Sequence, residues 1–130
     1  MVVNDKLKPE DLKEKLKLFW DLSGEKILRI ESEFDPGKGA PVYTVNGKYT
    51  TRGWTEWTQG FQFGSSLLQF DATGDEKFMN LGRDHTLKKM SPYLTHTGVH
   101  DHGFNNLSTF GNLFRLMKEQ IGRASCRERV

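Results

Sequence analysis

Mostly apolar residues recur at intervals of three and four along this chain. The longest series lies in residues 4–34 and consists of Leu12, Leu16, Phe19, Ser23, Ile27, Ile30 and Phe34. Because an α-helix turns once every 3.6 residues, this spacing places the series on one helix face. The same spacing recurs in residues 55–70, 76–90 and 105–119. The pattern therefore predicts about four helices and favours an all-α protein.

Turn-forming residues separate these segments. Asp35-Pro36-Gly37 ends the first helix, in which Gly24 is less favourable than alanine by about 1 kcal/mol and allows a break. Asn46-Gly47 lies between β-forming residues and predicts a small β-hairpin. Gly74 suits the end of the second helix, and Asp75 suits the cap of the third.

The second and fourth predicted helices each have an apolar face. The second helix has an apolar series and two glycines that leave a flat strip for another helix. The fourth helix has an apolar series of its own. The apolar series of the second helix consists of Trp57, Phe61, Gly64 and Leu68, and the flat strip consists of Gly60 and Gly64. The apolar series of the fourth helix consists of Leu107, Phe110, Phe114 and Met117.

Aromatic and polar residues gather where the second and fourth helices begin. This arrangement is typical of an α/α toroid, in which the ends of the inner helices line a central funnel. About four helices do not close a ring of six hairpins. We therefore expect residues 1–120 to form an incomplete (α/α)6 toroid of the six-hairpin type.

Residues 121–130 differ from the rest and resemble a translated sequencing adapter, so we treat them as a non-native tail. They hold three Arg, one Glu and the only Cys. Without them, Lys and Arg number 16 and Asp and Glu number 16, so the net charge falls from +2 to zero. A neutral chain gives no electrostatic reason to expect a nucleic acid or an anionic membrane as partner.

No apolar run approaches the roughly 20 residues that span a bilayer. Residues 1–6 contain no apolar signal region. We expect a cytoplasmic protein without a membrane partner, or a periplasmic one if the start is truncated.

The densest group of reactive side chains lies in residues 97–106, where His100, Asp101 and His102 are consecutive. The spacing from His96 fits no specific zinc pattern and no cysteine lies nearby, so we predict no metal and no cofactor. Asp101 is either a helix cap, stabilising by about 1 kcal/mol, or a carboxylate tuned by His100. For His102, packing in the interior of the protein is an alternative to a role in binding or catalysis.

A second group surrounds Trp54 and Trp57. Three residues apart, these two tryptophans share a face if both lie on a helix. They either fill a core or form a platform for a sugar ring. Arg52 is a candidate partner for a carboxylate, and Asn105 is a candidate partner for hydroxyls.

Two motifs carry a family resemblance. Trp57-Thr58-Gln59-Gly60-Phe61 and His100-Asp101-His102-Gly103-Phe104 resemble the W-T-x-G-F and H-D-x-G-F signatures of glycoside hydrolase family 88, the unsaturated glucuronyl hydrolases. The resemblance covers about residues 12–119. It departs at Gln62-Phe63, where the family often has Trp-Pro. It implies that the chain is the N-terminal part of an (α/α)6 barrel.

The resemblance also implies an activity. The family removes the 4,5-unsaturated uronic acid at the non-reducing end of lyase-generated oligosaccharides, by hydrating its vinyl ether. Asp101 would be one of the two important aspartates, and His100 and Trp57 would line the substrate pocket. The principal acid/base aspartate is expected beyond the end of this chain, so the chain as written is expected to be inactive.

Two alternatives stay open. A carbohydrate epimerase or isomerase on the same barrel would use several histidines. A non-catalytic sugar-binding helical module would use the tryptophan pair. The hydrolase interpretation predicts that the carboxyl group of Asp101 and the indole of Trp57 open onto a shared hollow.

Overall fold

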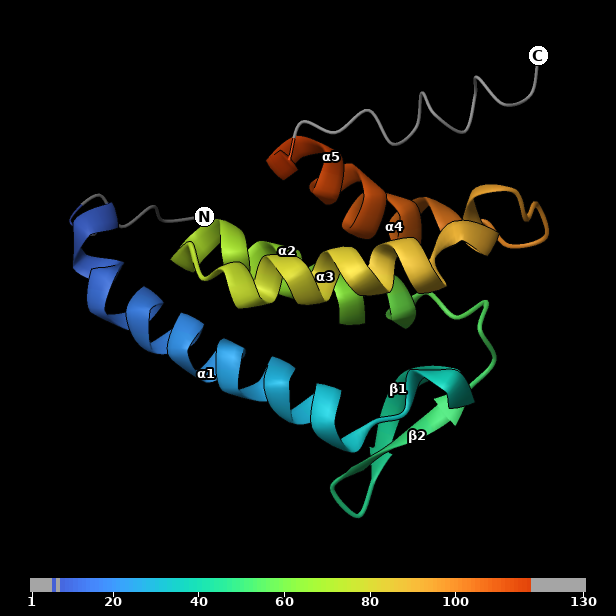
Figure 1. The fold of residues 1–130 in the computed structure, drawn as a ribbon. Helices are drawn as coiled ribbons and strands as arrows, with labels where there is room; N and C mark the ends of the chain where they lie inside the picture. Colours follow the sequence, from blue (N-terminus) through green and yellow to red (C-terminus); the bar gives the residue numbers. More distant parts are fainter. Residues whose placement is uncertain (1–5, 7, 118–130) are drawn as a thin grey trace.

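The structure is a computed structural model, and it describes residue 6 and residues 8–117. Its helices and strands are α1 (Lys13–Glu33), β1 (Ala40–Val45), β2 (Lys48–Arg52), α2 (Thr58–Thr73), α3 (Glu76–Lys89), α4 (His102–Asn106) and α5 (Asn112–Met117). Figure 1 shows α2 and α3 side by side at the centre, with α1 on one side and α4 and α5 on the other. The prediction of a mostly helical chain with a small hairpin is confirmed.

The first helix runs through Gly24 without a break. Gly24 is buried, and a Cβ there would lie 3.1 Å from the ring of Phe78 on α3. The predicted apolar series is buried only in its second half, at Ile27 and Phe34, whereas Leu16 and Phe19 are exposed. The neighbouring helices of the described chain therefore cover only the C-terminal half of this face.

The hairpin forms where the sequence predicts it. Strands β1 and β2 pair antiparallel, with Val45 opposite Lys48. Asn46 and Gly47 both have positive φ, at 50° and 74°, which is the type I′ geometry that matches the twist of the strands. The buried start of β1, Ala40 and Pro41, packs against α2. The hairpin thus closes one side of the space between α1 and α2.

The structure differs from the prediction for α2 in two respects. The helix begins at Thr58 rather than Thr55, and both tryptophans precede it, so the condition for their sharing a helix face is not met. Of the predicted apolar series, Trp57, Phe61 and Leu68 are all exposed. The buried side of the helix instead contains Gly60, Phe63, Gly64 and Leu67. The glycines select this face because they allow the closest approach of a neighbouring helix.

The joint between α2 and α3 follows the prediction. Gly74 has a φ of 71° and its N–H donates to the carbonyl of Phe70 at 2.7 Å. The carboxylate of Asp75 accepts a hydrogen bond from the N–H of Lys77 at 3.0 Å, which caps α3. A 3-10 turn over Ser91–Leu94 follows α3. The two helices are therefore held antiparallel by a short local turn.

The last helical segment starts earlier than predicted, at His102 rather than Asn105. A π-helical stretch, Leu107–Gly111, joins α4 to α5. The predicted apolar face is only partly correct. Leu107 is 71% exposed and Phe114 is also exposed, whereas Phe110 and Met117 are partly buried against the core. The buried residues are His102, Asn105, Thr109 and Leu113. Residues 118–119 of the predicted helix and the tail 121–130 lie outside the described residues.

The two glycines of α2 form a close contact with another helical segment, as predicted: Gly60 meets α4, and Gly64 meets the π-helical stretch that follows it. A Cβ at Gly60 would lie 2.6 Å from Oδ1 of Asn105 and would also overlap its Cα. A Cβ at Gly64 would lie 2.5 Å from the carbonyl oxygen of Ser108. The backbones of the two segments therefore approach so closely that side chains cannot fit between them.

The core consists of two apolar clusters that share α2. One cluster contains Phe63, Met90 and Tyr93, and the other contains Leu67, Met79 and Leu113. None of the helices in the described part of the chain is long and apolar enough to cross a bilayer.

Candidate functional site

A cluster of rings forms where the loop before α4 meets the segment before α2. The indole of Trp54 lies edge-on to Tyr93 and His96, with 5.3 and 5.1 Å between ring centroids, and stacks on His102 at 6.0 Å. The hydroxyl of Tyr93 bonds to the carbonyl of Trp54 and to Oε1 of Gln59, the latter at 3.1 Å. Burial raises the pKa of Tyr93 to about 12, so the hydroxyl remains protonated and able to donate. We call these rings the Trp54 cluster.

His102 is the buried member of the Trp54 cluster. Its Nε2 lies 2.8 Å from Nδ1 of His96, and its Nδ1 is buried with no partner among the described residues. Burial lowers the pKa of His102 from its ordinary value of 6.5, the neighbouring His96 lowers it further, and Asp101 partly opposes the shift. His102 is therefore neutral at pH 7. Its burial among the rings of the Trp54 cluster agrees with the alternative that this histidine is a packed residue.

We expect the free energy of unfolding to decrease as the pH falls below 6.5, the ordinary pKa of His102. Because the pKa is lower in the folded state, the unfolded chain binds the proton first. The stability from neutral His102 is thus complete above 6.5 and is lost as the pH falls toward the folded pKa. Thermal unfolding from about pH 8 to about pH 5 measures this slope.

His102→Phe keeps a ring in the cluster but removes the titration, so it should flatten this dependence. His100→Ala is the matched control, because the side chain of His100 is 94% exposed. An unchanged slope in His102→Phe would show that burial of the neutral imidazole is not its source.

Asp101 immediately precedes α4, but its side chain does not cap the helix. Its backbone carbonyl accepts the N–H groups of Phe104 and Asn105 at 3.0 and 3.2 Å. The carboxylate is 28% exposed, and its Oδ1 lies 3.4 Å from Nε2 of His100. The capping alternative is therefore wrong, and the carboxylate is accessible to a ligand beside an exposed imidazole.

Two predicted substrate contacts, Asn105 and Arg52, make contacts within the protein. Asn105 is fully buried, its Oδ1 accepts the N–H of Gly60 at 2.8 Å, and its Nδ2 donates to the carbonyl of Glu56 at 3.4 Å. This placement does not fit the predicted substrate contact, because both ends of the amide hold the backbone around the start of α2. Arg52 lies on β2, with its guanidinium carbon 5.8 Å from the centre of the Tyr43 ring.

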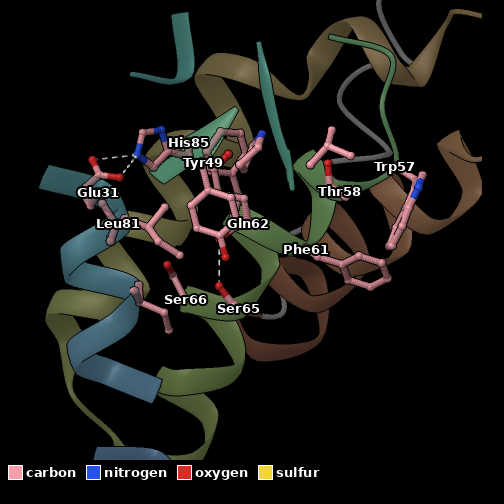
Figure 2. Close-up of a pocket in the computed structure, with 15 residues that line it drawn as sticks. Glu31, Tyr49, Trp57, Thr58, Phe61, Gln62, Ser65, Ser66, Leu81 and His85 are labelled. Atoms are coloured by element: carbon pink, nitrogen blue, oxygen red, sulfur yellow. Dashed lines mark hydrogen bonds and ion pairs between the residues drawn. The ribbon is translucent and has the colours of Figure 1, made fainter. Parts of the chain in front are cut away.

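Trp57 lines a cavity of about 300 Å³ that is bounded by α1, the hairpin, α2 and α3. Figure 2 shows Trp57 and Phe61 on one side of this cavity, and Glu31 and His85 on the other. The rings of Trp57 and Phe61 meet edge to face, with centroids 5.5 Å apart. Asp101 is not among the lining residues, so this cavity is not the hollow predicted to join Trp57 to Asp101. Trp54 is the tryptophan that contacts the segment containing Asp101, through His102.

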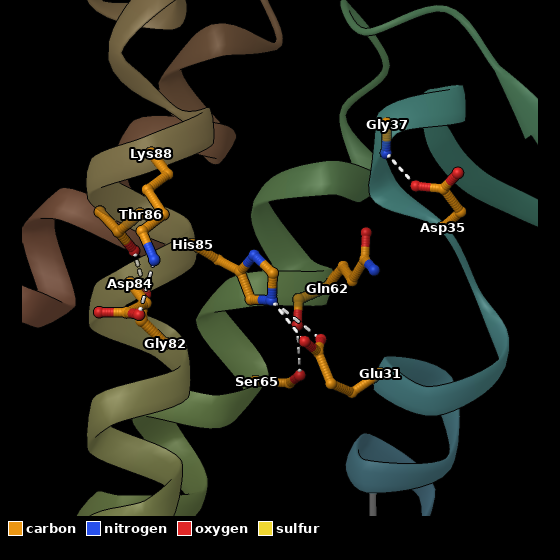
Figure 3. A network of polar contacts seen from close by, with 10 residues as sticks. All are labelled: Glu31, Asp35, Gly37, Gln62, Ser65, Gly82, Asp84, His85, Thr86 and Lys88. Carbon is orange, nitrogen blue, oxygen red and sulfur yellow. Dashed lines mark hydrogen bonds and ion pairs between the residues drawn. The ribbon is translucent and has the colours of Figure 1, made fainter.

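The sequence interpretation missed a hydrogen bond that joins α1 to α3. Nε2 of His85 lies 2.9 Å from each carboxylate oxygen of Glu31, as Figure 3 shows. The ring of His85 also stacks on Phe63 of α2, with 4.5 Å between centroids. A signal was available, because His85 continues the spacing of three and four that Phe78 and Leu81 begin. Its partner Glu31 is 54 residues away and has no local signature.

Within residues 8–117, no three His, Cys, Asp or Glu side chains are grouped in a way that could hold a metal ion. The site therefore offers a carboxylate, imidazoles and aromatic faces, which suit proton transfer and the binding of a hydroxylated ring. Comparisons with models of protein families, with curated proteins and with solved structures each gave no match.

Proposed function

We propose that this chain is the N-terminal part of a cytoplasmic six-hairpin (α/α)6 glycosidase. The enzyme would remove the 4,5-unsaturated uronic acid from lyase-generated oligosaccharides by hydrating its vinyl ether. The observation that carries the proposal is the placement of the two motifs. W-T-Q-G-F surrounds the start of α2 and H-D-H-G-F surrounds the start of α4, and these helices pack directly through Gly60.

The exposure of the Asp101 carboxylate and its lack of a helix-cap hydrogen bond support the proposed hydrolase. A carboxylate that is neither capping a helix nor fully buried is able to exchange protons with a bound ligand. His100 beside it is positioned to contact the uronate or a hydroxyl. In the proposed reaction, an acid protonates C4 of the vinyl ether, water adds at C5, and the hemiketal collapses to release the sugar. Asp101 supports this chemistry, and the principal proton donor comes from a later part of the enzyme.

Exposed apolar residues support the toroid. Large apolar side chains are exposed on three helical segments of the described chain: Leu16, Phe19, Phe61, Leu68, Leu107 and Phe114. Clusters of such residues normally mark a surface that another element covers. Further hairpins of a toroid would cover these faces.

A sugar-binding module without catalysis is the second candidate, and the cavity beside Trp57 favours it. The two functions are distinguished by turnover. The protein encoded by the complete reading frame should remove the ultraviolet absorbance of the conjugated double bond when it is supplied with a lyase-generated unsaturated disaccharide. Binding without any loss of absorbance would support the module, and interconversion of sugar epimers would support the epimerase alternative.

A further inference from the structure

The loop that ends at Asp101 is closed at its base by two imidazoles. Residues 95–101 connect the 3-10 turn after α3 to α4, and this loop extends beyond the ends of both helices (Figure 1). Nδ1 of His96, near the start of the loop, lies 2.8 Å from Nε2 of His102, directly after its end. Residues 95–98 and 100 are exposed, so the loop has little packing of its own. The contact between the two rings is therefore placed to determine where the loop lies.

The two histidines differ in their surroundings. His102 is 5% exposed and lies within the Trp54 cluster, with its ring centroid 4.8 Å from that of Tyr93. Burial and then His96 lower the pKa of His102, and the charge of Asp101 raises it. The side chain of His96 is exposed, so burial does not oppose a charge on this ring. As the pH falls, His96 therefore takes up the first proton.

The unpaired nitrogen of His102 indicates which ring donates the hydrogen bond. Nδ1 of His102 is buried and has no partner among the described residues. A neutral imidazole carries one proton, on either Nδ1 or Nε2. Buried N–H groups without an acceptor are rarer in proteins than buried acceptors without a donor. We therefore assign the proton to Nε2, so that His102 donates the hydrogen bond and Nδ1 of His96 accepts it.

Protonation of His96 breaks this arrangement. An imidazolium carries a proton on both nitrogens, so Nδ1 of a charged His96 no longer accepts the N–H of His102. The two N–H groups would face each other across 2.8 Å unless the proton of His102 moved to its buried, unpaired Nδ1. Each outcome is unfavourable, because one N–H group of His102 is left without an acceptor.

The neighbouring polar groups do not replace the lost acceptor. The hydroxyl of Tyr93 is bound to the carbonyl of Trp54 and to Oε1 of Gln59. Oδ1 of Asp101 lies 3.4 Å from Nε2 of His100, on the exposed side of the loop. The base of the loop therefore depends on a neutral His96.

We propose that His96 is a positioning residue for Asp101. In its neutral form it accepts the hydrogen bond of His102 and holds the base of the loop closed. In its charged form it releases the loop, and with it the Asp101 carboxylate. The effect on hydrolysis rests on the function proposed above, whereas the hydrogen bond and the order of the loop do not.

NMR tests the hydrogen bond and the loop directly, in the protein encoded by the complete reading frame. Nitrogen-15 shifts of the imidazoles at about pH 8 should show His102 with its proton on Nε2. Heteronuclear NOE values for the amides of residues 97–101 should fall between about pH 8 and about pH 5, because a released loop moves faster. A His102 proton on Nδ1 at the higher pH, or NOE values that do not change, would overturn the proposal.

Two substitutions at position 96 separate the acceptor from its titration. His96→Asn keeps an acceptor, because its Oδ1 takes the place of Nδ1, but it does not titrate. His96→Phe keeps a ring and has no acceptor. The asparagine variant should keep high NOE values at both pH values, and the phenylalanine variant should have low values at both. Thr97→Ala changes another exposed residue of the loop and should behave as the wild type.

The rate of uronate release provides the second readout. His96→Phe should lower kcat/KM by about tenfold at every pH, because Asp101 is no longer held in place. His96→Asn should match the wild type at about pH 8 and lose less activity at about pH 5. Since His100 and Asp101 titrate in both proteins, the difference between the two pH profiles belongs to position 96.

Identical profiles for His96→Asn and the wild type would contradict the positioning role. A protein that releases no uronate at any pH would refute the proposed hydrolysis instead. In that case the NOE values of the two variants still decide whether His96 holds the loop, so the two failures are distinguishable.

Discussion

Replacing Asp101 with asparagine is expected to lower the rate of uronate release by about 10²- to 10⁴-fold in the complete enzyme. Asparagine has the same shape but neither carries charge nor exchanges a proton. Because the Asp101 carboxylate makes no helix cap, the substitution should not weaken α4. A large loss of rate with an unchanged melting temperature is the expected combination, measured by absorbance of the conjugated double bond and by thermal unfolding.

Asp84→Asn is the matched control for this experiment. Asp84 is an exposed carboxylate on α3, and its Oδ2 accepts a hydrogen bond from Nζ of Lys88 at 2.9 Å. This variant removes one carboxylate in a different part of the structure and should retain the full rate. If Asp101→Asn also retained the full rate, Asp101 would have no catalytic role, and the resemblance in the H-D-H-G-F motif would carry no function.

Gly60→Ala is expected to cause the largest loss of stability among single substitutions in the contact between α2 and α4. The added methyl group would overlap the Cα of Asn105 and lie 2.6 Å from its Oδ1. The helices must move apart, which also breaks the hydrogen bond from the N–H of Gly60 to Asn105, now 2.8 Å long. Overpacking against backbone together with a lost buried hydrogen bond should reduce the free energy of unfolding by about 3 kcal/mol.

Gly103→Ala provides the comparison for Gly60→Ala. Gly103 is also helical, but a Cβ there would meet nothing within 4 Å. The better helix propensity of alanine should leave this variant unchanged or stabilise it by up to about 1 kcal/mol. Urea unfolding measures both variants. Equal free energies of unfolding for the two would contradict the close approach of α2 and α4.

Features that depend on local backbone geometry were predictable from the sequence. Asn46-Gly47 forms its turn, and Gly74 and Asp75 end and begin their helices. The glycine strip of α2 is also the contact with another helix. The turn and the helix ends depend on the conformational preferences of neighbouring residues. The glycine strip is recognisable from its missing side chains, although the residues that meet it lie elsewhere in the chain.

The buried faces of the helices were not predictable in the same way. In α2, Trp57, Phe61 and Leu68 form one periodic series, whereas Phe63 and Leu67 lie on the face that is buried. Periodicity identifies a helix with two apolar sides but does not say which side meets a partner. That choice depends on the contact through glycine, which is a tertiary interaction.

Polar residues in the core also misled the sequence interpretation. Thr109 is fully buried, and its hydroxyl donates to the carbonyl of Asn105 at 2.6 Å. Asn105 is itself paired with the backbone of α2. Because these groups satisfy one another inside the fold, they occupy core positions that the apolar spacing does not identify.

The candidate site was only partly predictable. The sequence interpretation singled out the His100-Asp101-His102 segment, but it paired that segment with Trp57, whereas the structure places Trp54 against His102. Tyr93, which contacts both Trp54 and His102, gave no motif. Residues this far apart in the sequence come into contact only through the packing of helices and loops. No local pattern in the sequence indicates such packing.

The π-helical stretch Leu107–Gly111 affects where this protein can vary in length. A π turn is in effect one extra residue inside an α-helix, and removing that residue would restore regular winding. The positions after it would then keep their orientation, and Leu113 would stay in its cluster with Leu67 and Met79. A deletion inside a regular helix such as α3 has no such compensation and would turn every later position by about 100° around the helix axis. One-residue deletions should therefore be better tolerated in this stretch than in the middle of α3.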